Sequence, residues 1–252
     1  MTAYKKLCTE FYDLDKPHAP ADALDFYLQY AANAGGPILE PMCGTGRFLL
    51  PLLARGFDVE GLDSSPEMLS ACRARARSQG LSPVLHEQNL VDFSPQRQFG
   101  LVFIPSGSFC LLTAEATVRA ALGRIFSAML PGATFLVEIE RLLPREASTS
   151  GTWGGRWLER PDGAKLIISW LSQYSGVEGI SRSIHRYELV KDGQLLASEY
   201  EDFELKFYEP EAFRKLLEEA GFWKVQLFKA YERAEPSDAD EGLIFACQKP
   251  AR

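Results

Sequence analysis

Two acidic strand ends, each followed by a turn and a helix, are the most informative feature of this 252-residue sequence. In the first, Glu40 precedes a glycine turn at Gly44 and Gly46. Such a turn brings a ligand close to bare backbone N–H groups. In the second, Asp63 ends a strand at a place where a carboxylate can accept hydrogen bonds from both hydroxyls of a ribose. Together these residues predict a site for a nucleoside with a cationic tail and no phosphate.

The glycine spacing disfavours the common phosphate-binding loops. Gly44 and Gly46 fit the first two glycines of the dinucleotide fingerprint G-x-G-x-x-G, but Leu49 stands at the third position. A P-loop would require Gly-Lys followed by Ser or Thr, and the sequence has no such run here. Glu40 would also repel a pyrophosphate, whereas it would suit an ammonium group. An NAD-dependent oxidoreductase is therefore a less favoured alternative, which an NAD titration would test.

The elements that must position these residues alternate between strands and helices. Short apolar runs predict strands at 38–40, 57–63, 84–86, 101–104, 132–140, 225–231 and 243–248. Helical spacing of apolar residues predicts helices at 22–34, 47–55, 65–79 and 114–129, and another from Pro210. This alternation is typical of an α/β protein with a doubly wound, mostly parallel sheet. We therefore expect a Rossmann-like, seven-stranded sheet.

The pattern changes after about residue 145. Turn signals at 160–163 and 191–194 separate stretches with partial period-two alternation at 166–174, 180–190 and 195–208. These features predict an antiparallel β insertion after the fifth strand, which contains Trp153, Trp157 and Trp170. We expect residues 1–149 and 209–252 to form one domain and residues 150–208 to form an inserted lid that binds substrate.

The run from Ile38 to Cys72 resembles the cofactor half of class I S-adenosylmethionine-dependent methyltransferases. The segment Glu40-x-x-Cys43-Gly44-x-Gly46 is similar to the first motif of that family. The segment 61–69, Gly-Leu-Asp-Ser-Ser-Pro-Glu-Met-Leu, is similar to the second. The resemblance extends over about residues 36–140 and resumes at 209–249. It is closest to small-molecule methyltransferases with a lid inserted late in the chain.

The resemblance implies that the site binds S-adenosylmethionine. Glu40 would lie under the methionine end of this cofactor, and Gly44 and Gly46 would line its approach. Asp63 would hold the ribose, and Met68 would cover the adenine. The other residues that the resemblance places at the cofactor are Cys43, Ser64, Asn89, Leu90, Pro105 and Ser106.

Asn89, Leu90, Pro105 and Ser106 lie in two loops. Asn89 and Leu90 match the place where a polar residue and a backbone N–H contact the adenine edge, although Asp is commoner than Asn there. The loop 105–108, after the fourth strand, would flank the methyl donor. Met42 departs from the family, because many members have glycine or alanine at this position.

Methyl transfer from a sulfonium is an in-line displacement, so the protein chiefly aligns donor and acceptor and excludes water. A base is needed only if the acceptor must lose a proton. Tyr12 resembles N-terminal tyrosines that reach the methyl end of the cofactor in related lidded enzymes; a packed residue of a surface helix is the alternative. His185 could accept a proton near neutral pH, and a structural cross-strand histidine is the alternative. Glu138 or Glu140 could orient a polar substrate.

Composition restricts location and partners. The 27 Lys and Arg residues against 34 Asp and Glu give a formal net charge of −7, which argues against a nucleic-acid partner. No apolar run reaches the roughly 20 residues of a membrane span, and we expect no membrane association. The five scattered cysteines form no CxxC pair, so we expect reduced thiols, no metal site and a cytoplasmic location.

The leading hypothesis is an enzyme, an S-adenosylmethionine-dependent methyltransferase that acts on nitrogen or oxygen of a small-molecule acceptor. A non-catalytic S-adenosylmethionine-binding interaction protein is the alternative, and a test for turnover separates the two. The aromatic residues of the insertion would cover the active site. They could equally form the interface of a homodimer.

Overall fold

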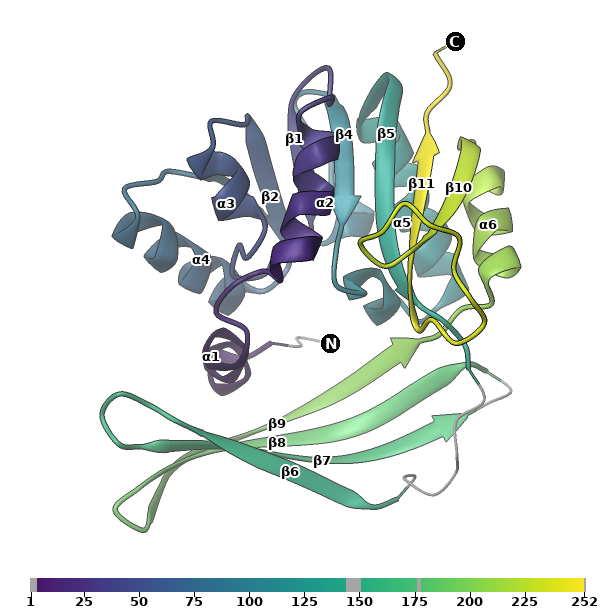
Figure 1. Ribbon diagram of the computed structural model, residues 1–252. Coiled ribbons are helices and arrows are strands. Elements are labelled where there is room, and N and C mark those ends of the chain that lie inside the picture. Colours follow the sequence, from purple (N-terminus) through teal and green to yellow (C-terminus); the bar gives the residue numbers. More distant parts are fainter. Residues whose placement is uncertain (1–3, 144–150, 176–177, 252) are drawn as a thin grey trace.

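The computed structural model describes residues 4–143, 151–175 and 178–251. They form two sheets that face each other across a helix near the N-terminus (Figure 1). The larger sheet contains β1 (Ile38–Pro41), β2 (Val59–Asp63), β3 (Val84–Glu87), β4 (Phe99–Ile104), β5 (Met129–Glu140), β10 (Trp223–Lys229) and β11 (Gly242–Gln248). The smaller sheet contains β6 (Trp153–Glu159), β7 (Lys165–Ser175), β8 (Ile180–Lys191) and β9 (Gln194–Lys206).

The larger sheet has the strand order β10-β11-β5-β4-β1-β2-β3. Its first five strands in sequence pair in parallel, and β11 pairs antiparallel with both β5 and β10. The order reverses direction at β1, so the carboxyl ends of β1 and β4 lie at a topological switch point, where sheets of this type bind ligands. This confirms the predicted seven-stranded, mostly parallel sheet.

Helices cover both faces of the larger sheet. They are α2 (Ala21–Ala31), α3 (Leu49–Ala54), α4 (Pro66–Ser78), α5 (Glu115–Ala128) and α6 (Pro210–Glu219), with short 3₁₀ turns η1 (Leu90–Asp92) and η2 (Ser108–Leu111). Successive residues of β4 point to opposite faces, so Leu101 and Phe103 pack with α2 and α3, whereas Val102 and Ile104 pack with α5. Every residue of β4 is buried, as expected for a strand covered on both sides.

Local signals in the sequence explain where α4 begins. Ser65 is its N-cap, and the Ser65 hydroxyl accepts a hydrogen bond from the Met68 backbone N–H at 3.1 Å. Pro66 occupies the first helical position, where its missing N–H costs nothing, and Glu67 lies near the positive end of the helix. This start fixes the position of Met68 immediately after β2.

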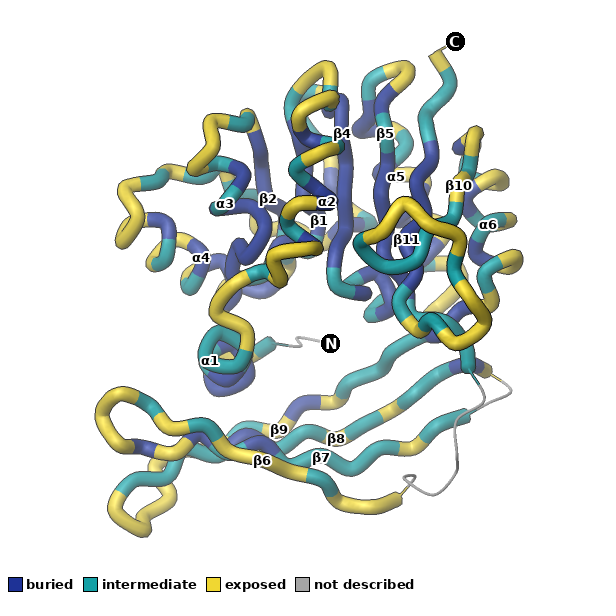
Figure 2. The backbone as a smooth tube through the Cα atoms, viewed as in Figure 1, coloured by how far each residue is buried: buried dark blue, intermediate teal, exposed yellow. Residues whose placement is uncertain are grey.

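The smaller sheet is antiparallel throughout, as predicted for the insertion, but it has one strand more than the predicted stretches. The additional strand is β6, which contains Gly154 and Gly155, and glycine weakens the strand signal. A Cβ atom at Gly154 would lie 2.6 Å from the Trp170 ring, so glycine is needed for this ring to lie against β6. Figure 2 shows that much of this sheet is half-buried or exposed, in contrast to the buried centre of the larger sheet.

We predicted no element for residues 6–15, where the structure has α1 (Lys6–Asp15). This helix packs on the smaller sheet: Leu7, Cys8 and Phe11 form one apolar cluster with Ile168 and Tyr187. Among the described residues, no helix is long and apolar enough to cross a membrane. The bounds 1–149 and 209–252 for one domain and 150–208 for a lid remain a proposal, and the contacts of α1 tie its residues to the lid.

Candidate active site

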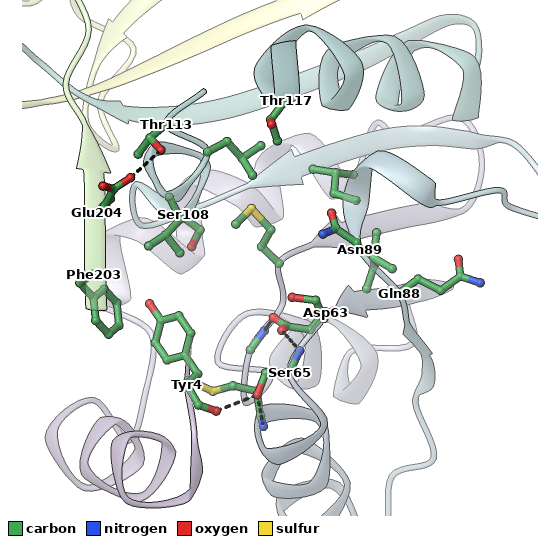
Figure 3. A pocket seen from close by; sticks show the side chains of 18 of the residues that line it. Tyr4, Asp63, Ser65, Gln88, Asn89, Ser108, Thr113, Thr117, Phe203 and Glu204 are labelled. Atoms are coloured by element: carbon green, nitrogen blue, oxygen red, sulfur yellow. Dashed lines mark hydrogen bonds between the residues drawn. The ribbon is translucent and has the colours of Figure 1, made fainter. Parts of the chain in front are cut away.

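A pocket of about 360 Å³ lies at the carboxyl ends of β1, β2 and β3, with α1 and β9 on its other side (Figure 3). Seven predicted site residues line it: Tyr12, Gly44, Asp63, Ser64, Met68, Asn89 and Leu90. Six others lie outside its lining: Glu40, Cys43, Gly46, Pro105, Ser106 and His185. The residues of both predicted motifs therefore converge on one place, although not every one of them reaches its surface.

Asp63 ties the two turns of the site together. Its Oδ2 accepts a hydrogen bond from the Gly44 N–H at 2.8 Å, and its Oδ1 accepts one from the Ser65 N–H at 2.9 Å. Burial raises the pKa of Asp63, while the backbone N–H groups of Ser65, Gly44 and Ser64 oppose that rise. Each carboxylate oxygen keeps a second lone pair, so Asp63 can still accept hydrogen bonds from a ligand.

The turn after β1 uses backbone conformations that favour glycine. Gly44 and Gly46 have φ angles of 54° and 80°. Met42 also has a positive φ, 59°, which an L-residue with a side chain adopts at a cost. The departure at Met42 therefore preserves the left-handed conformation that glycine would adopt freely. Met68 packs over this turn, since a Cβ at Gly44 would lie 3.7 Å from the Met68 sulfur.

Glu40 lies outside the pocket lining and is 2% exposed. Its Oε2 has no hydrogen-bond partner among the described residues. Burial raises the pKa of Glu40 well above its usual range, and the positive charge of Arg47 and the Leu49 N–H act in the opposite direction. A cationic group that reached this oxygen would compensate the buried carboxylate.

Tyr12 lines the pocket from α1, and its ring lies 5.2 Å from the Arg47 guanidinium carbon. Burial is the main reason that the pKa of Tyr12 is raised. Arg47 also donates a hydrogen bond from Nη2 to the Ser106 hydroxyl at 3.1 Å. In the sequence Arg47 marks only the start of a predicted helix, and no motif indicates its contacts at the site.

A buried carboxylate supports the loop after β4. Glu138 Oε2 accepts a hydrogen bond from the Ser106 N–H at 2.7 Å, and Tyr231 donates its hydroxyl to the same oxygen at 3.0 Å. Ser106 has a φ of 58°, and Tyr231 has a φ of 62°, so both residues hold left-handed backbone. Burial raises the pKa of Glu138 to about 7, and Glu140 also raises it. Pro105 is buried in this loop, where its carbonyl accepts a hydrogen bond from the Ser108 hydroxyl at 3.0 Å.

His185 lies on β8, beside the pocket wall. Its Nε2 is 2.9 Å from the Ser183 hydroxyl, and its ring stacks on Phe203 with centroids 4.6 Å apart. Burial lowers the pKa of His185, which favours the neutral ring. Phe203 stands in the pocket lining, so His185 supports that residue from behind. Cys43 is likewise buried behind the lining, with its sulfur facing Gly61.

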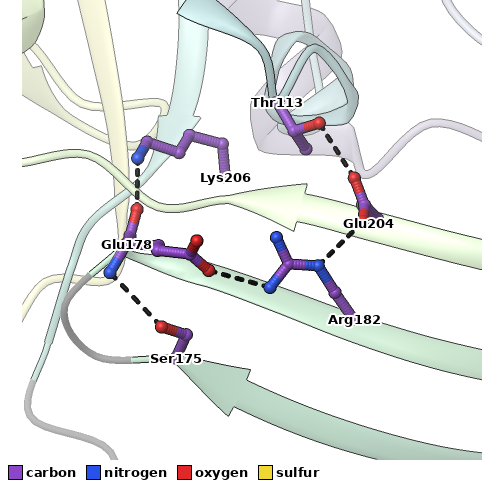
Figure 4. Close-up of polar contacts among 6 residues, drawn as sticks. All are labelled: Thr113, Ser175, Glu178, Arg182, Glu204 and Lys206. Carbon is purple, nitrogen blue, oxygen red and sulfur yellow. Dashed lines mark hydrogen bonds and ion pairs between the residues drawn. The ribbon is translucent and has the colours of Figure 1, made fainter.

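One end of the pocket, where β9 contacts the loop before α5, was not predicted from the sequence. Thr113 donates its hydroxyl to Glu204 Oε2 at 3.0 Å, and Arg182 donates Nε to Glu204 Oε1 at 2.9 Å (Figure 4). Arg182 also donates Nη1 to Glu178 at 2.8 Å, and Lys206 donates to the Glu178 carbonyl. No local sequence signal pairs Thr113 with Glu204, since 91 positions separate them.

Tyr4, Gln88, Thr117 and Phe203 also line the pocket and were not predicted. Gln88 directly precedes Asn89, which was predicted to contact the adenine edge, so this part of the chain was predicted to lie at the site. Tyr4 and Phe203 come from the N-terminal segment and from the insertion, where the family resemblance is weak. Their positions depend on how α1 docks on β9.

Comparisons with known proteins agree with this geometry. Residues 38–132 match the family described as a methyltransferase domain. YqeM of Bacillus subtilis is 25% identical over 241 residues, with 94% of each chain covered. A dTDP-3-amino-3,6-dideoxy-alpha-D-glucopyranose N,N-dimethyltransferase of Streptomyces fradiae is 32% identical over 142 residues, which cover 54% of each chain.

The whole fold has a counterpart among solved structures. An S-adenosylmethionine-dependent methyltransferase from Clostridium acetobutylicum superposes with a TM-score of 0.78 at 18% sequence identity, over 96% of this chain and 97% of that one. The likeness therefore includes the smaller sheet as well as the larger. Residues 38–132 of this chain are therefore similar to a methyltransferase domain, and the chain as a whole has the fold of this solved methyltransferase.

Proposed function

We propose that the chain transfers a methyl group from S-adenosylmethionine to nitrogen or oxygen of a small-molecule acceptor. The observation that carries this proposal is Glu40, a buried carboxylate whose Oε2 has no hydrogen-bond partner among the described residues. A buried acceptor without a partner is costly, and an ammonium group at the methionine end of the cofactor would remove that cost.

The charges that line the pocket support a ligand without phosphate. Asp63, Asp202 and Glu204 line it, and none of its described lining residues is Lys, Arg or His. Such a pocket repels a pyrophosphate, which disfavours NAD, and it suits the cationic sulfonium. In this proposal Asp63 holds the ribose, and Asn89 and Leu90 lie along the adenine edge.

The residues of the chain would then align donor and acceptor. The cofactor supplies an activated methyl group, so the acceptor lone pair needs alignment and a water-free site rather than acid catalysis. Tyr12 stands on the α1 side of the pocket, and Glu138 and Arg47 hold the loop at Ser106. We assign Tyr12 the position nearest the transferred methyl group, and we assign His185 a supporting place behind Phe203.

An amine on a small molecule is the acceptor that the relatives favour. The Streptomyces fradiae protein is named for N,N-dimethylation of an amino sugar nucleotide. A pocket closed on two sides by α1 and β9 also suits a small acceptor better than a nucleic acid. The five free, buried cysteines support the expected cytoplasmic location.

We also propose that the outer face of the smaller sheet forms a homodimer. On the side away from α1, the residues Trp153, Trp157 and Tyr200 are more than half exposed, and Ile184 lies on the same face. The same patch on two copies is self-complementary about a two-fold axis, as a symmetric dimer requires. Sedimentation velocity should find a dimer that Trp157→Lys weakens, and a wild-type monomer at all concentrations would contradict this proposal.

Thermal unfolding with S-adenosylhomocysteine, beside NAD, tests the function. A ligand at ~100 times its dissociation constant stabilises the folded state by roughly 2.7 kcal/mol, which for this chain length raises the midpoint by about 5–10 °C. We expect that rise with S-adenosylhomocysteine alone, and we expect Asp63→Ala to lose it.

Glu87→Ala is the matched control, because Glu87 ends the neighbouring strand in register with Asp63 and is exposed. This variant should keep the full response. No response from the folded wild type, purified free of ligand, would overturn the proposal. A response with no turnover of any amine would instead favour the non-catalytic alternative.

A further inference from the structure

The N-terminus of α1 is held by carboxylates of the smaller sheet. Glu201 Oε1 accepts a hydrogen bond from the Lys5 N–H at 2.6 Å, and Glu201 Oε2 accepts one from the Tyr4 N–H at 2.9 Å. Glu199 accepts one from the Leu7 N–H at 2.7 Å. Lys5 is the N-cap of α1, and its own side chain makes no cap hydrogen bond. The sheet therefore supplies the acceptors and the negative charge that a helix N-terminus requires.

Glu201 depends on this contact as much as α1 does. Glu201 is 4% exposed, and it forms no ion pair with the described residues. A buried carboxylate without a cation needs N–H donors, and backbone N–H groups at a helix end are strong ones. Glu201 has acceptor oxygens that need donors, and the start of α1 has N–H donors that need acceptors, so each satisfies the other and α1 is joined to β9.

Tyr4 is the residue through which this contact reaches the pocket. Its φ of 65° lies in the left-handed region, which a tyrosine occupies only where its surroundings hold it there. Glu201 fixes its N–H, and its carbonyl accepts a hydrogen bond from the Ser65 hydroxyl at 2.9 Å. The same hydroxyl caps α4, so Tyr4 bridges the smaller sheet and the helix that follows β2.

The Tyr4 ring forms part of the pocket wall. It packs edge-on against Phe203 with centroids 5.3 Å apart (Figure 3). It also packs edge-on against Tyr12, with centroids 6.2 Å apart. All three aromatic residues line the pocket, together with Asp63 and Asn89. Tyr4 and Tyr12 belong to the N-terminal segment, and Glu201 binds the Tyr4 and Lys5 N–H groups at the start of that segment.

We propose that Glu201 is a positioning residue of the cofactor site, which holds Tyr4 and α1 as the wall that encloses S-adenosylmethionine. This inference rests on the proposed function. It predicts that α1 and the smaller sheet behave as one unit, and that loss of the Glu201 charge opens the pocket without touching the residues that bind the ribose.

The test measures two quantities in Glu201→Gln: affinity for S-adenosylhomocysteine by calorimetry, and hydrogen exchange of the α1 amides. We expect the dissociation constant to rise about tenfold, because two hydrogen bonds to a charged group are weakened. Exchange in α1 should become faster while exchange in α4 stays as in the wild type. Glu201→Asp, which keeps the charge, should recover part of the affinity.

Glu188→Gln is the matched control, since Glu188 lies on the opposite face of the same sheet and should leave both quantities unchanged. Tyr4→Ala removes the ring and leaves the Glu201 cap, so it should weaken binding without faster exchange in α1. This second variant tests the inference even if Glu201→Gln does not fold.

The outcomes separate this inference from the function beneath it. Wild-type affinity in Glu201→Gln despite faster α1 exchange would overturn the inference, and so would wild-type affinity in Tyr4→Ala. A wild-type protein that binds no S-adenosylhomocysteine would overturn the proposed function and this inference together.

Discussion

The two sheets use their carboxylates in different ways. In the larger sheet Glu40, Asp63 and Glu138 lie toward the carboxyl ends of β1, β2 and β5, where burial raises the pKa of each. In the smaller sheet Glu201 and Glu204 both come from β9 and accept hydrogen bonds from α1 and from the loop before α5. Of the first group, Asp63 lines the floor of the pocket, whereas Glu40 and Glu138 lie outside its lining and support that floor; the second group attaches the walls.

This difference indicates that floor and walls depend on different energies. A buried carboxylate at a strand end is costly in charged form, so its contribution changes with pH. A carboxylate that joins two segments contributes through a few hydrogen bonds, each of modest net value. We therefore expect changes in the floor to alter stability strongly and changes in the walls to alter ligand exchange more gently.

The largest expected effect is the pH dependence of Glu138. Its pKa of about 7 in the folded protein lies above its ordinary value of 4.5, so folding favours the protonated form. Stability from this group is fully present below pH 4.5 and decreases as the pH rises toward 7. The groups that face it are Glu140, Tyr27 and Tyr231, and the neighbouring carboxylate reinforces the effect.

Glu138→Gln should remove this pH dependence. As the pH is raised from 5 to 8, the wild type should lose up to about 3 kcal/mol of unfolding free energy that the variant keeps. Urea unfolding at several pH values measures the difference. A difference that does not vary with pH would show that Glu138 stays charged in the folded state, and the description of the floor would be wrong there.

A smaller effect is expected from two glycines that have the same φ of 80°, Gly46 in the larger sheet's first turn and Gly163 in the insertion. A Cβ at Gly46 would lie 2.7 Å from the Cys72 sulfur, whereas a Cβ at Gly163 would meet nothing within 4 Å. In both alanine variants the positive φ is unfavourable for the new side chain, and only in Gly46→Ala does the new methyl group also crowd a neighbouring side chain. Gly46→Ala should be less stable than Gly163→Ala by about 2 kcal/mol.

Denaturant unfolding of the two variants sharpens the contrast between a packed floor and an open insertion. The comparison also separates strain from crowding, because only the second differs between them. Equal losses would mean that α4 shifts to admit the new methyl group, and the close packing behind the cofactor turn would be refuted.

The larger sheet could be predicted because its signals are local. Glu40, Gly44 and Gly46 fall within a few positions of each other, and Ser65 and Pro66 mark the start of α4 directly. Each local choice agrees with the strand–turn–helix alternation, so the elements of this sheet, and the convergence of its two motifs on one pocket, could be predicted from the sequence. His185 lies in the predicted sheet, but the sequence could not place it behind Phe203 rather than in the pocket.

The walls could not be predicted because their contacts join distant parts of the chain. The Tyr4 N–H bonds to Glu201 across 197 positions, and α1 carries no N-cap side chain of its own to announce its start. The glycines of β6 hid one strand of the insertion in the same way, since their role depends on Trp170. Such pairings have no periodicity, and only the docked structure reveals them.

The smallest expected effect concerns the wall that Thr113 and Glu204 close. Thr113→Val keeps the shape of the side chain and removes the hydroxyl that donates to Glu204, while Arg182 still binds the other carboxylate oxygen. We expect S-adenosylhomocysteine to dissociate about threefold faster, with little change in unfolding free energy. Stopped-flow displacement measures this rate.

Thr117→Val is the control, because Thr117 lines the same pocket but makes no hydrogen bond to the described residues of the smaller sheet. If Thr117→Val accelerates release as much as Thr113→Val does, the effect belongs to the pocket surface, and the wall does not depend on this hydrogen bond.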